Sequence, residues 1–166
     1  MPPTSRGGWS ASTISRRALL TGMAAVGLSA CLPGTWRGPR GFQGLPDPAA
    51  PPGLPDGLFT LCVASGDPTP DGVVLWSRLA PDPLAGGGMP DGMDVIVRWQ
   101  LARDEAMTDL VADGATQTGP SVAHSLHVDV SGLEPGTTYF YRFTTGGQSS
   151  PVGRTRTAPA AGTPVD

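Results

Sequence analysis

The chain has 166 residues, enough for one domain of ordinary size with tails, and a net charge of −3. Every basic residue is arginine, and no cluster of cations favours nucleic acid as a partner, since such binding depends on counterion release. Two cysteines, Cys31 and Cys62, are too few for a multi-bridge disulfide framework. The 24 glycines and 19 prolines gather in particular segments, and these divide the chain.

Residues 1–31 are predicted to be an export signal. Arg16 and Arg17 precede an uncharged, mostly apolar run over 18–30. This run is shorter than the roughly 20 residues that cross a bilayer, but it suits the apolar region of a signal peptide. The Ser-Arg-Arg-x-Leu-Leu pattern resembles a twin-arginine signal, which exports folded proteins. A periplasmic or extracellular location is therefore expected.

The sequence Leu-Ser-Ala-Cys at 28–31 resembles a bacterial lipobox. In a lipobox the cysteine is acylated and becomes the first residue of the mature protein. Cys31 is therefore the candidate lipidation site, and its lipid would hold the protein on a membrane face without spanning the membrane. The alternative is cleavage at a nearby bond, with Cys31 discarded.

Residues 32–57 are predicted to be a linker. Proline and glycine fill half of this range, and the apolar residues show almost no periodicity. Such a composition buries too little surface to offset the entropy of ordering the chain. A tether without a fold of its own is expected here.

Residues 58–158 are predicted to form one all-β domain. Short apolar runs recur between turn residues, and no segment has a convincing 3.6-residue period. About seven strands with a turn every dozen residues or so predict a β-sandwich of the fibronectin type III or immunoglobulin type. A short helical turn is compatible with 104–110. The expected strands are 59–64, 72–79, 94–102, a hairpin of 108–112 and 115–117 around Asp113-Gly114, 122–130, 137–144 and 150–157.

Five side chains are predicted to be structural. In the stretch SGLEPGTTYFYRF, Leu133, Pro135 and Tyr139 resemble the tyrosine corner of Greek-key sandwiches. In that corner the tyrosine hydroxyl bonds back to the loop backbone. Trp76 and Trp99 are predicted core aromatics, each from an early strand.

An acidic loop is the first candidate for chemistry. Asp67, Thr69, Asp71 and Gly72 occupy positions 1, 3, 5 and 6 of a calcium-hand pattern. Position 12 is Arg78, however, where that pattern needs a bidentate glutamate. A proline-braced turn, with the aspartates bonding the backbone, is the favoured interpretation.

The remaining candidates also favour structure over chemistry. His124 and His127 lie three apart on an expected strand and so point to opposite faces, which disfavours one shared metal. His124 is expected to pack, His127 to lie on the surface, and Cys62 to be a buried thiol. Arg154 and Arg156 could bind an anion, but a solvated, charge-protected edge is favoured. No catalytic and no metal-binding residue is predicted.

Four blocks, in order over about 58–162, resemble the N-terminal domain of alkaline phosphatase D enzymes. They are FTLCVASGDPTPDGVVLWSRLAPDP, VRWQLARDEAM, HSLHVDVSGLEPGTTYFYRF and VGRTRTAPAAG. Cys62 departs from the family, which more often has glycine there. The resemblance implies a fibronectin-like sandwich followed by a metallophosphoesterase domain. That domain binds iron and calcium, hydrolyses phosphate mono- and diesters, and holds all the metal ligands and catalytic residues.

The sequence therefore predicts the non-catalytic N-terminal sandwich of an exported alkaline phosphatase D-like enzyme. Residues 159–166 would begin the linker to the C-terminal metallophosphoesterase domain, which this chain lacks. No cofactor is expected in the sandwich itself. Without its neighbour, an apolar face that includes Ile96 or Phe140 is expected to be exposed. The alternative is a free-standing fibronectin-like envelope lipoprotein that acts as a binding module.

Overall fold

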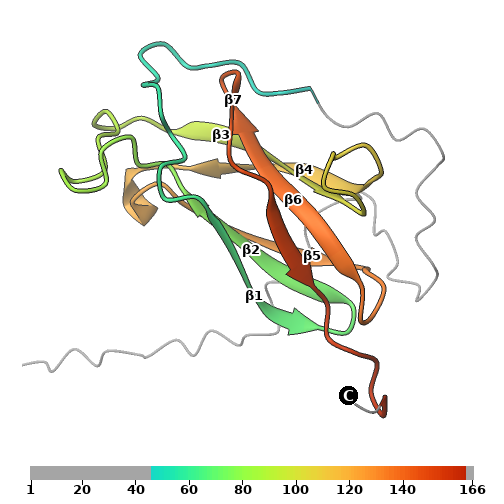
Figure 1. Cartoon of the computed structure of the whole chain (residues 1–166). Coiled ribbons are helices and arrows are strands. Elements are labelled where there is room, and N and C mark those ends of the chain that lie inside the picture. The colour runs from blue at the N-terminus through green and yellow to red at the C-terminus, as the bar shows by residue number, and fades with distance from the viewer. Residues whose placement is uncertain (1–45, 164–166) are drawn as a thin grey trace, which may run out of the picture. The chain divides into compact units, whose positions relative to one another are not determined.

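Two antiparallel sheets make up residues 46–163, the part of the chain that the computed structural model describes (Figure 1). One sheet has the order β1-β2-β5; in the other, β4-β3-β6, both β7 and β8 pair with β6. A short 3-10 turn, η1 (Pro120–Val122), precedes β5. The strands are β1 (Val63–Thr69), β2 (Gly72–Arg78), β3 (Val95–Ala102), β4 (Leu110–Thr118), β5 (Ser125–Ser131), β6 (Thr138–Thr145), β7 (Gln148–Ser149) and β8 (Gly153–Arg156). The predicted all-β sandwich is confirmed.

The two sheets enclose one apolar core between their inner faces. Alternate residues of β2, β3, β5 and β6 point inward, as the two-residue period of a strand requires. The rings of Tyr141 and Phe143 pack edge to face, with centroids 6.4 Å apart and planes at 88°. The buried core consists of Leu58, Phe59, Val73, Leu75, Leu79, Val95, Val97, Leu101, Leu126, Val128, Val130, Tyr139, Tyr141 and Phe143.

The first strand begins later than predicted. It was expected at 59–64, but β1 starts at Val63, and Leu58 and Phe59 enter the core from a turn instead. Cys62 ends this turn with a left-handed backbone (φ 61°) and an exposed side chain. The prediction of a buried thiol within a strand is therefore wrong, because the left-handed residue breaks the strand before the thiol could point inward.

Most of the acidic stretch, residues 67–72, lies in the two strands of a β-hairpin and not in a loop. β1 continues to Thr69, which pairs with Gly72 of β2, so the turn itself is only two residues long. A register shift falls between Gly66 and Thr69, where Asp67 has φ 46°. Thr69 donates a side-chain hydrogen bond to Asp71 (3.0 Å). The predicted turn is thus shorter than expected and is preceded by a β-bulge.

β4 is one continuous strand, so the hairpin predicted at Asp113-Gly114 is wrong. Gly114 pairs with Trp99 of β3, and a Cβ atom at Gly114 would lie 2.6 Å from Cζ2 of the indole. Close approach of a neighbouring side chain is the other common reason for a glycine within a strand. The glycine makes room for Trp99 and does not turn the chain.

The loop between β3 and β4 is a hydrogen-bonded turn and contains no helix. The carboxylate of Asp104 accepts hydrogen bonds from the N–H groups of Thr108 (2.9 Å) and Asp109 (2.7 Å). A further bond from the Thr108 hydroxyl (2.6 Å) contributes most to lowering the pKa of Asp104. The carboxylate of Asp104 therefore accepts the N–H hydrogen bonds that backbone carbonyls would accept in the expected helical turn.

The later strands lie close to their predicted ranges. The largest differences are at the starts of β5, which was expected from 122 and starts at Ser125, and of β8, which was expected from 150 and starts at Gly153. Residues Ala123 and His124 have left-handed backbones with φ of 50° and 55°, so they cannot continue a strand. Boundaries are the part of a strand that a sequence pattern defines least.

Part of the range predicted as linker lies against the sandwich. Among residues 46–57, the carbonyl of Pro48 accepts a hydrogen bond from Gly146 N–H (3.1 Å). The carbonyl of Pro55 accepts one from Nε2 of Gln148 (2.9 Å). These contacts lie around the turn between β6 and β7. The folded part of the chain therefore starts upstream of the predicted boundary at Leu58.

Candidate functional site

A cleft opens along the seam between β1 and β8, which are edge strands of the two sheets and lie side by side at the front of Figure 1. At one end of the seam, Ala158 N–H donates to the carbonyl of Thr69 (3.0 Å). At the other end, Gly153 packs against Val63, whose Cγ2 would be 2.7 Å from a Cβ on the glycine. The cleft between these ends has a volume of ≈ 360 Å³ and is lined by Ser65, Gly66, Pro68, Arg154, Thr155 and Arg156.

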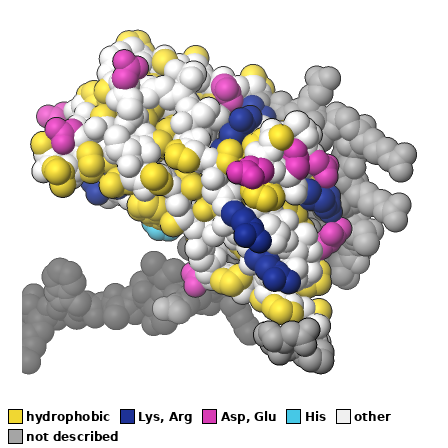
Figure 2. Space-filling view, viewed as in Figure 1, with side chains coloured by type: hydrophobic (Ala, Val, Ile, Leu, Met, Phe, Trp, Pro, Cys, Tyr) yellow, Lys and Arg dark blue, Asp and Glu magenta, His cyan; other side chains and the backbone are white. Residues whose placement is uncertain are grey.

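The rim of the cleft is basic. Arg154 and Arg156 are both exposed, and Figure 2 shows basic side chains along the course of β8. Nε of Arg156 donates to the carbonyl of Gly136 (3.1 Å), a bond that leaves the positive charge uncompensated. Within residues 46–163, neither arginine forms an ion pair. The cleft therefore favours an anionic group although the whole chain is acidic.

The residues packed beneath the lining of the cleft form its floor and carry no charge. A hydrogen bond joins the side chains of Tyr141 and Ser65, and burial raises the pKa of the Tyr141 hydroxyl. The ring of Tyr141 lies so close to Gly153 that a Cβ there would be 2.4 Å from Cζ. Thr155 is buried beside it. The floor is thus closely packed, and its hydroxyl groups stay uncharged at neutral pH.

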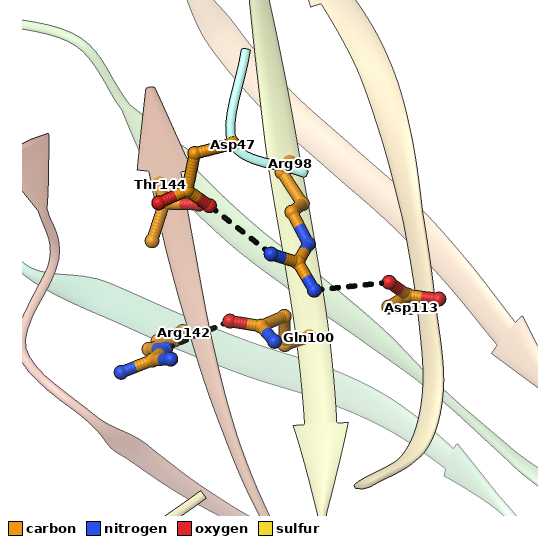
Figure 3. A network of polar contacts seen from close by, with 6 residues as sticks. All are labelled: Asp47, Arg98, Gln100, Asp113, Arg142 and Thr144. Atoms are coloured by element: carbon orange, nitrogen blue, oxygen red, sulfur yellow. Dashed lines mark hydrogen bonds and ion pairs between the residues drawn. The ribbon is translucent and has the colours of Figure 1, made fainter. Parts of the chain in front are cut away.

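A second polar cluster lies on the outer face of β3 and β6 (Figure 3). Arg98, only 8% exposed, forms ion pairs with Asp47 (3.1 Å) and Asp113 (3.2 Å). Thr144 donates to Asp47 (2.7 Å), and this bond, followed by the neighbouring Arg98, lowers the pKa of Asp47. Nε of Arg98 is buried without a hydrogen-bond partner in the described part of the chain. The cluster attaches the segment before the first strand to the sheet.

The residues proposed for a tyrosine corner come together as expected. Tyr139 is 1% exposed, and its hydroxyl accepts a hydrogen bond from Glu134 N–H (3.0 Å). Leu133 packs against the core. The carbonyl of Pro135 accepts a bond from the Thr137 hydroxyl (3.1 Å). The loop before β6 is therefore tied to the strand that follows it.

The two tryptophans lie on different faces of their sheets. Trp99 packs against the core from the inner face of β3. Trp76 follows the fully buried Leu75 in β2 and so points outward, where it pairs with His127 of β5. The prediction that Trp76 is a core aromatic is wrong, because a one-residue difference in register changes the face of the sheet.

The two histidines point apart. His124 is 7% exposed and its Nε2 lies 2.8 Å from the carbonyl of Met93, whereas His127 is exposed.

Among residues 46–163, no three His, Cys, Asp or Glu side chains are grouped to hold a metal ion. In the same range no helix is long and apolar enough to cross a membrane. The predicted signal residues Arg16, Arg17 and Cys31 lie outside the described residues.

Sequence reasoning missed both the cleft and the Arg98 cluster. Asp47 is a single carboxylate in a proline-rich segment, and nothing local connects it to β3. Arg98 offered a signal, because it interrupts a run of apolar residues in a strand. A buried arginine needs a carboxylate, but the pattern does not say which one.

Two facing antiparallel sheets with a tyrosine corner define an immunoglobulin-like or fibronectin type III-like β-sandwich. Residues 48–159 match the family model described as PhoD-like phosphatase, N-terminal domain. The chain belongs to this family.

The similar proteins match part of this chain. Alkaline phosphatase D of Bacillus subtilis (strain 168) is 54% identical over 107 residues, which are 64% of this chain and 18% of that protein. A solved structure described as "Structure of PhoD" is 57% identical with a TM-score of 0.62, covering 64% of this chain and 20% of that one. The fn3 domain of human collagen alpha-1(XX) chain is 22% identical with a TM-score of 0.38, covering 74% and 94%. The chain matches about a fifth of the length of its phosphatase relatives.

Proposed function

We propose that this chain is the non-catalytic N-terminal sandwich of an exported alkaline phosphatase D-like metallophosphoesterase. Phosphate mono- and diester hydrolysis is assigned to a C-terminal domain. The observation that carries the proposal is the extent of the match. Close similarity to Alkaline phosphatase D covers 64% of this chain but only 18% of that protein. Most of the relative is therefore left to carry its phosphatase chemistry.

The contacts of the titratable side chains support a structural role. His124 is bonded to a backbone carbonyl, Asp47 and Asp113 are paired with Arg98, and Asp104 holds a turn. Iron and calcium, which the resemblance implies for the whole enzyme, are assigned to the C-terminal domain. The described residues bring no three potential ligands together, so their arrangement does not fit either metal.

An activity measurement tests the non-catalytic role. The purified chain, supplied with iron and calcium, is expected to hydrolyse neither p-nitrophenyl phosphate nor bis-p-nitrophenyl phosphate. Alkaline phosphatase D of Bacillus subtilis is the positive control under the same conditions. Hydrolysis that rises in proportion to the concentration of the chain would show that the sandwich holds an active site after all.

The DNA beyond codon 166 separates the proposal from its alternative. A reading frame that continues into Asp-, His- and Asn-rich metallophosphoesterase motifs supports the proposal. A stop codon at that point, followed by an intact terminator, supports the free-standing envelope lipoprotein that binds a partner.

Export and anchoring form a separate part of the proposal. Arg16 and Arg17 are assigned to a twin-arginine signal, and Cys31 to lipidation. Replacing both arginines with lysine should leave the protein in the cytoplasm, and Cys31→Ala should release it from the membrane fraction. Mass spectrometry that finds an unmodified Cys31 within the mature protein would rule out the anchor.

A further inference from the structure

We propose that the outer face of the sheet β1-β2-β5 is the surface that docks against the hydrolase domain of the whole enzyme. The inference rests on the proposed function, because it requires such a domain. It adds which face of the sandwich meets the hydrolase and the chemistry of the contact, in which Trp76 lies at the apolar centre of a surface with a polar rim.

The centre of this face is apolar. Val74 and Trp76 lie between buried, inward-facing residues of β2, so their side chains leave the sheet on the side away from the core. Their partners in β1 are small, since Ala64 pairs with Trp76 and Gly66 pairs with Val74. β1 therefore adds little side-chain bulk to the face, and the indole and the valine side chain dominate it.

The described residues leave this centre open. Val74 and Trp76 are half-buried, and neither belongs to the core cluster or packs against it. Ala64 and Gly66 are exposed, and a Cβ at Gly66 would have nothing within 4 Å. The space over Gly66, beside Val74, can therefore receive an apolar side chain of a partner.

The outer face of the other sheet is covered by the chain itself. Arg98, Gln100 and Thr144 point away from the core there, yet they are only 8%, 3% and 2% exposed. Asp47, from the segment before β1, is bonded to both Arg98 and Thr144 (Figure 3). One outer face is therefore covered by the N-terminal segment, whereas the other has no such cover among the described residues.

The exposed Ile96 does not make the other sheet the better candidate. It lies on the outer face of β3 and is 54% exposed, but its partner in β4 is the polar Gln117. The polar side chains of Arg98 and Gln100 separate it from the half-buried Phe140. A single exposed apolar side chain is normal on a protein surface and needs no partner.

A polar rim borders the apolar centre of the β1-β2-β5 face. His127 and Asp129 of β5 pair with Trp76 and Val74, and both are exposed. An apolar centre with a polar, solvated rim is the usual anatomy of a protein interface. Tryptophan is also enriched among the residues that contribute most to binding. The face therefore has the composition of an interface and not that of an ordinary solvated sheet.

The size of the face favours a tethered partner. Three strands of seven residues each give a face of roughly 300 Å². This area is about one side of the smallest interfaces between domains of one chain, whereas a stable complex of separate proteins buries roughly 800 Å² on each partner. A domain of the same chain needs less contact, because a short connection gives it an effective concentration in the millimolar range.

The chain leaves the sandwich beside this sheet. Ala158, two residues after β8, donates its N–H to the carbonyl of Thr69 (3.0 Å). Thr69 is the last residue of β1 and lies at the hairpin end of the β1-β2-β5 sheet. A domain that follows Ala158 therefore starts at the edge of the proposed docking face.

Hydroxyl-radical footprinting tests the docking face. The free 166-residue chain is compared with a chimera in which residues 46–163, which have their own core, replace the matching domain of Bacillus subtilis Alkaline phosphatase D. In the chimera the oxidation of Trp76 should fall at least about fivefold, because the centre of an interface excludes water. His127 should also be protected, whereas Phe140 on the outer face of the other sheet should be oxidised equally in both proteins.

A charge at the centre of the face tests its chemistry. Trp76→Glu in the chimera should return the oxidation of His127 to its level in the free chain, a rise of at least about threefold, because burying an unpaired carboxylate is strongly unfavourable. Phe140→Glu, the same change at a half-buried aromatic of the other sheet, is the matched control and should leave His127 protected. Circular dichroism checks that both variants are folded.

Gly66→Gln provides a second and milder test. A Cβ at this position meets no neighbour in the free domain, so the free chain should keep its stability. In the chimera the added side chain would occupy the space that a side chain of the hydrolase needs. The oxidation of both Trp76 and His127 should therefore rise toward the level of the free chain.

The possible outcomes separate this inference from the proposed function. Equal oxidation of Trp76 in the free chain and in an active chimera, or protection of Phe140 instead, would overturn the docking face while the proposed function stands. Protection of Trp76 that grows with the concentration of the free chain would also overturn it, because a second copy would then cover the face. A chimera that is folded but inactive beside an active parent would count against the proposed function, and the oxidation of Trp76 would still decide where the two domains meet.

Discussion

The outer face of β3 and the seam between β1 and β8 both carry arginines, but only the first has its carboxylates within the domain. Arg98 is buried between Asp47 and Asp113, whereas Arg154 and Arg156 are exposed beside a cleft without acidic residues. Burial and a carboxylate partner within the domain therefore distinguish an arginine that stabilises the fold from one that can bind a partner. The following changes test this distinction.

Removal of Arg98 should have the largest effect on stability. Arg98→Ala takes the cation away from two carboxylates, and the side chain of Asp113 is only 3% exposed. Breaking a buried pair in this way is expected to lower the free energy of unfolding by about 3–5 kcal/mol, measured by urea denaturation. Arg142→Ala, which removes a partly buried arginine bonded to Gln100, is the matched control. Equal losses from both variants would contradict the special role of the Arg98 cluster.

Gly153→Ala should have the next largest effect, because it overfills the floor of the seam. The added Cβ would lie 2.4 Å from Cζ of Tyr141 and 2.7 Å from Cγ2 of Val63. Overpacking of this kind typically costs about 1–3 kcal/mol, again measured by urea denaturation. Gly66→Ala in the same cleft has nothing within 4 Å and should change stability little. If the two variants were equally stable, the floor would not be closely packed.

Asp47→Asn should have a smaller effect that depends on pH. The pKa of Asp47 lies below its ordinary value of 3.8, because Thr144 donates to the carboxylate and Arg98 lies beside it. The ionised form therefore favours folding above pH 3.8, and this contribution is lost as the pH falls through the lowered pKa.

The measurement compares wild type and variant at two pH values. Near neutral pH the variant should lose up to about 1 kcal/mol, a limit set by the exposure of the Asp47 side chain. In acid, below the lowered pKa, the difference should disappear. Asp56→Asn, in an exposed aspartate of the same segment, is the control. A difference that grows in acid would reverse the assigned sign.

Charge reversal at the seam should have the smallest effect on the sandwich alone. Arg154→Glu/Arg156→Glu changes exposed side chains without an ion pair among the described residues. The free energy of unfolding of the isolated chain should stay within about 0.5 kcal/mol of wild type for each site. A loss as large as that of Arg98→Ala would mean that the arginines of β8 hold the fold too.

The sequence predicted correctly those elements that are defined by residues close together along the chain. The alternation of 94–102 predicted β3, and the spacing of Leu133, Pro135 and Tyr139 predicted the corner that the Tyr139 hydroxyl closes. Cys62 and Trp76 were misplaced because left-handed residues and strand register decide which face a side chain takes. Those features depend on tertiary contacts.

The candidate site was less predictable than the fold. The sequence identified Arg154 and Arg156 as an exposed pair on the last strand. It did not show that β1 lies beside them, because Ser65 and Arg154 are far apart along the chain. The Arg98 cluster was hidden for the same reason, since Asp47 lies in a segment whose composition predicts a linker.

The attachment of Asp47 also decides how the domain would carry mechanical load. A pull on the N-terminal side would first strain the contacts of Asp47 with Arg98 and Thr144. A pull on the C-terminal side would first strain the bonds of Ala158 to Thr69 and Gly136 and then the pairing of β8 with β6. Asp47 is held by Thr144 of the same strand β6, so tension between the two ends would run within the sheet of β3, β6 and β8. In that direction the backbone pairing of β8 with β6, and not the packing between the two sheets, would resist extension.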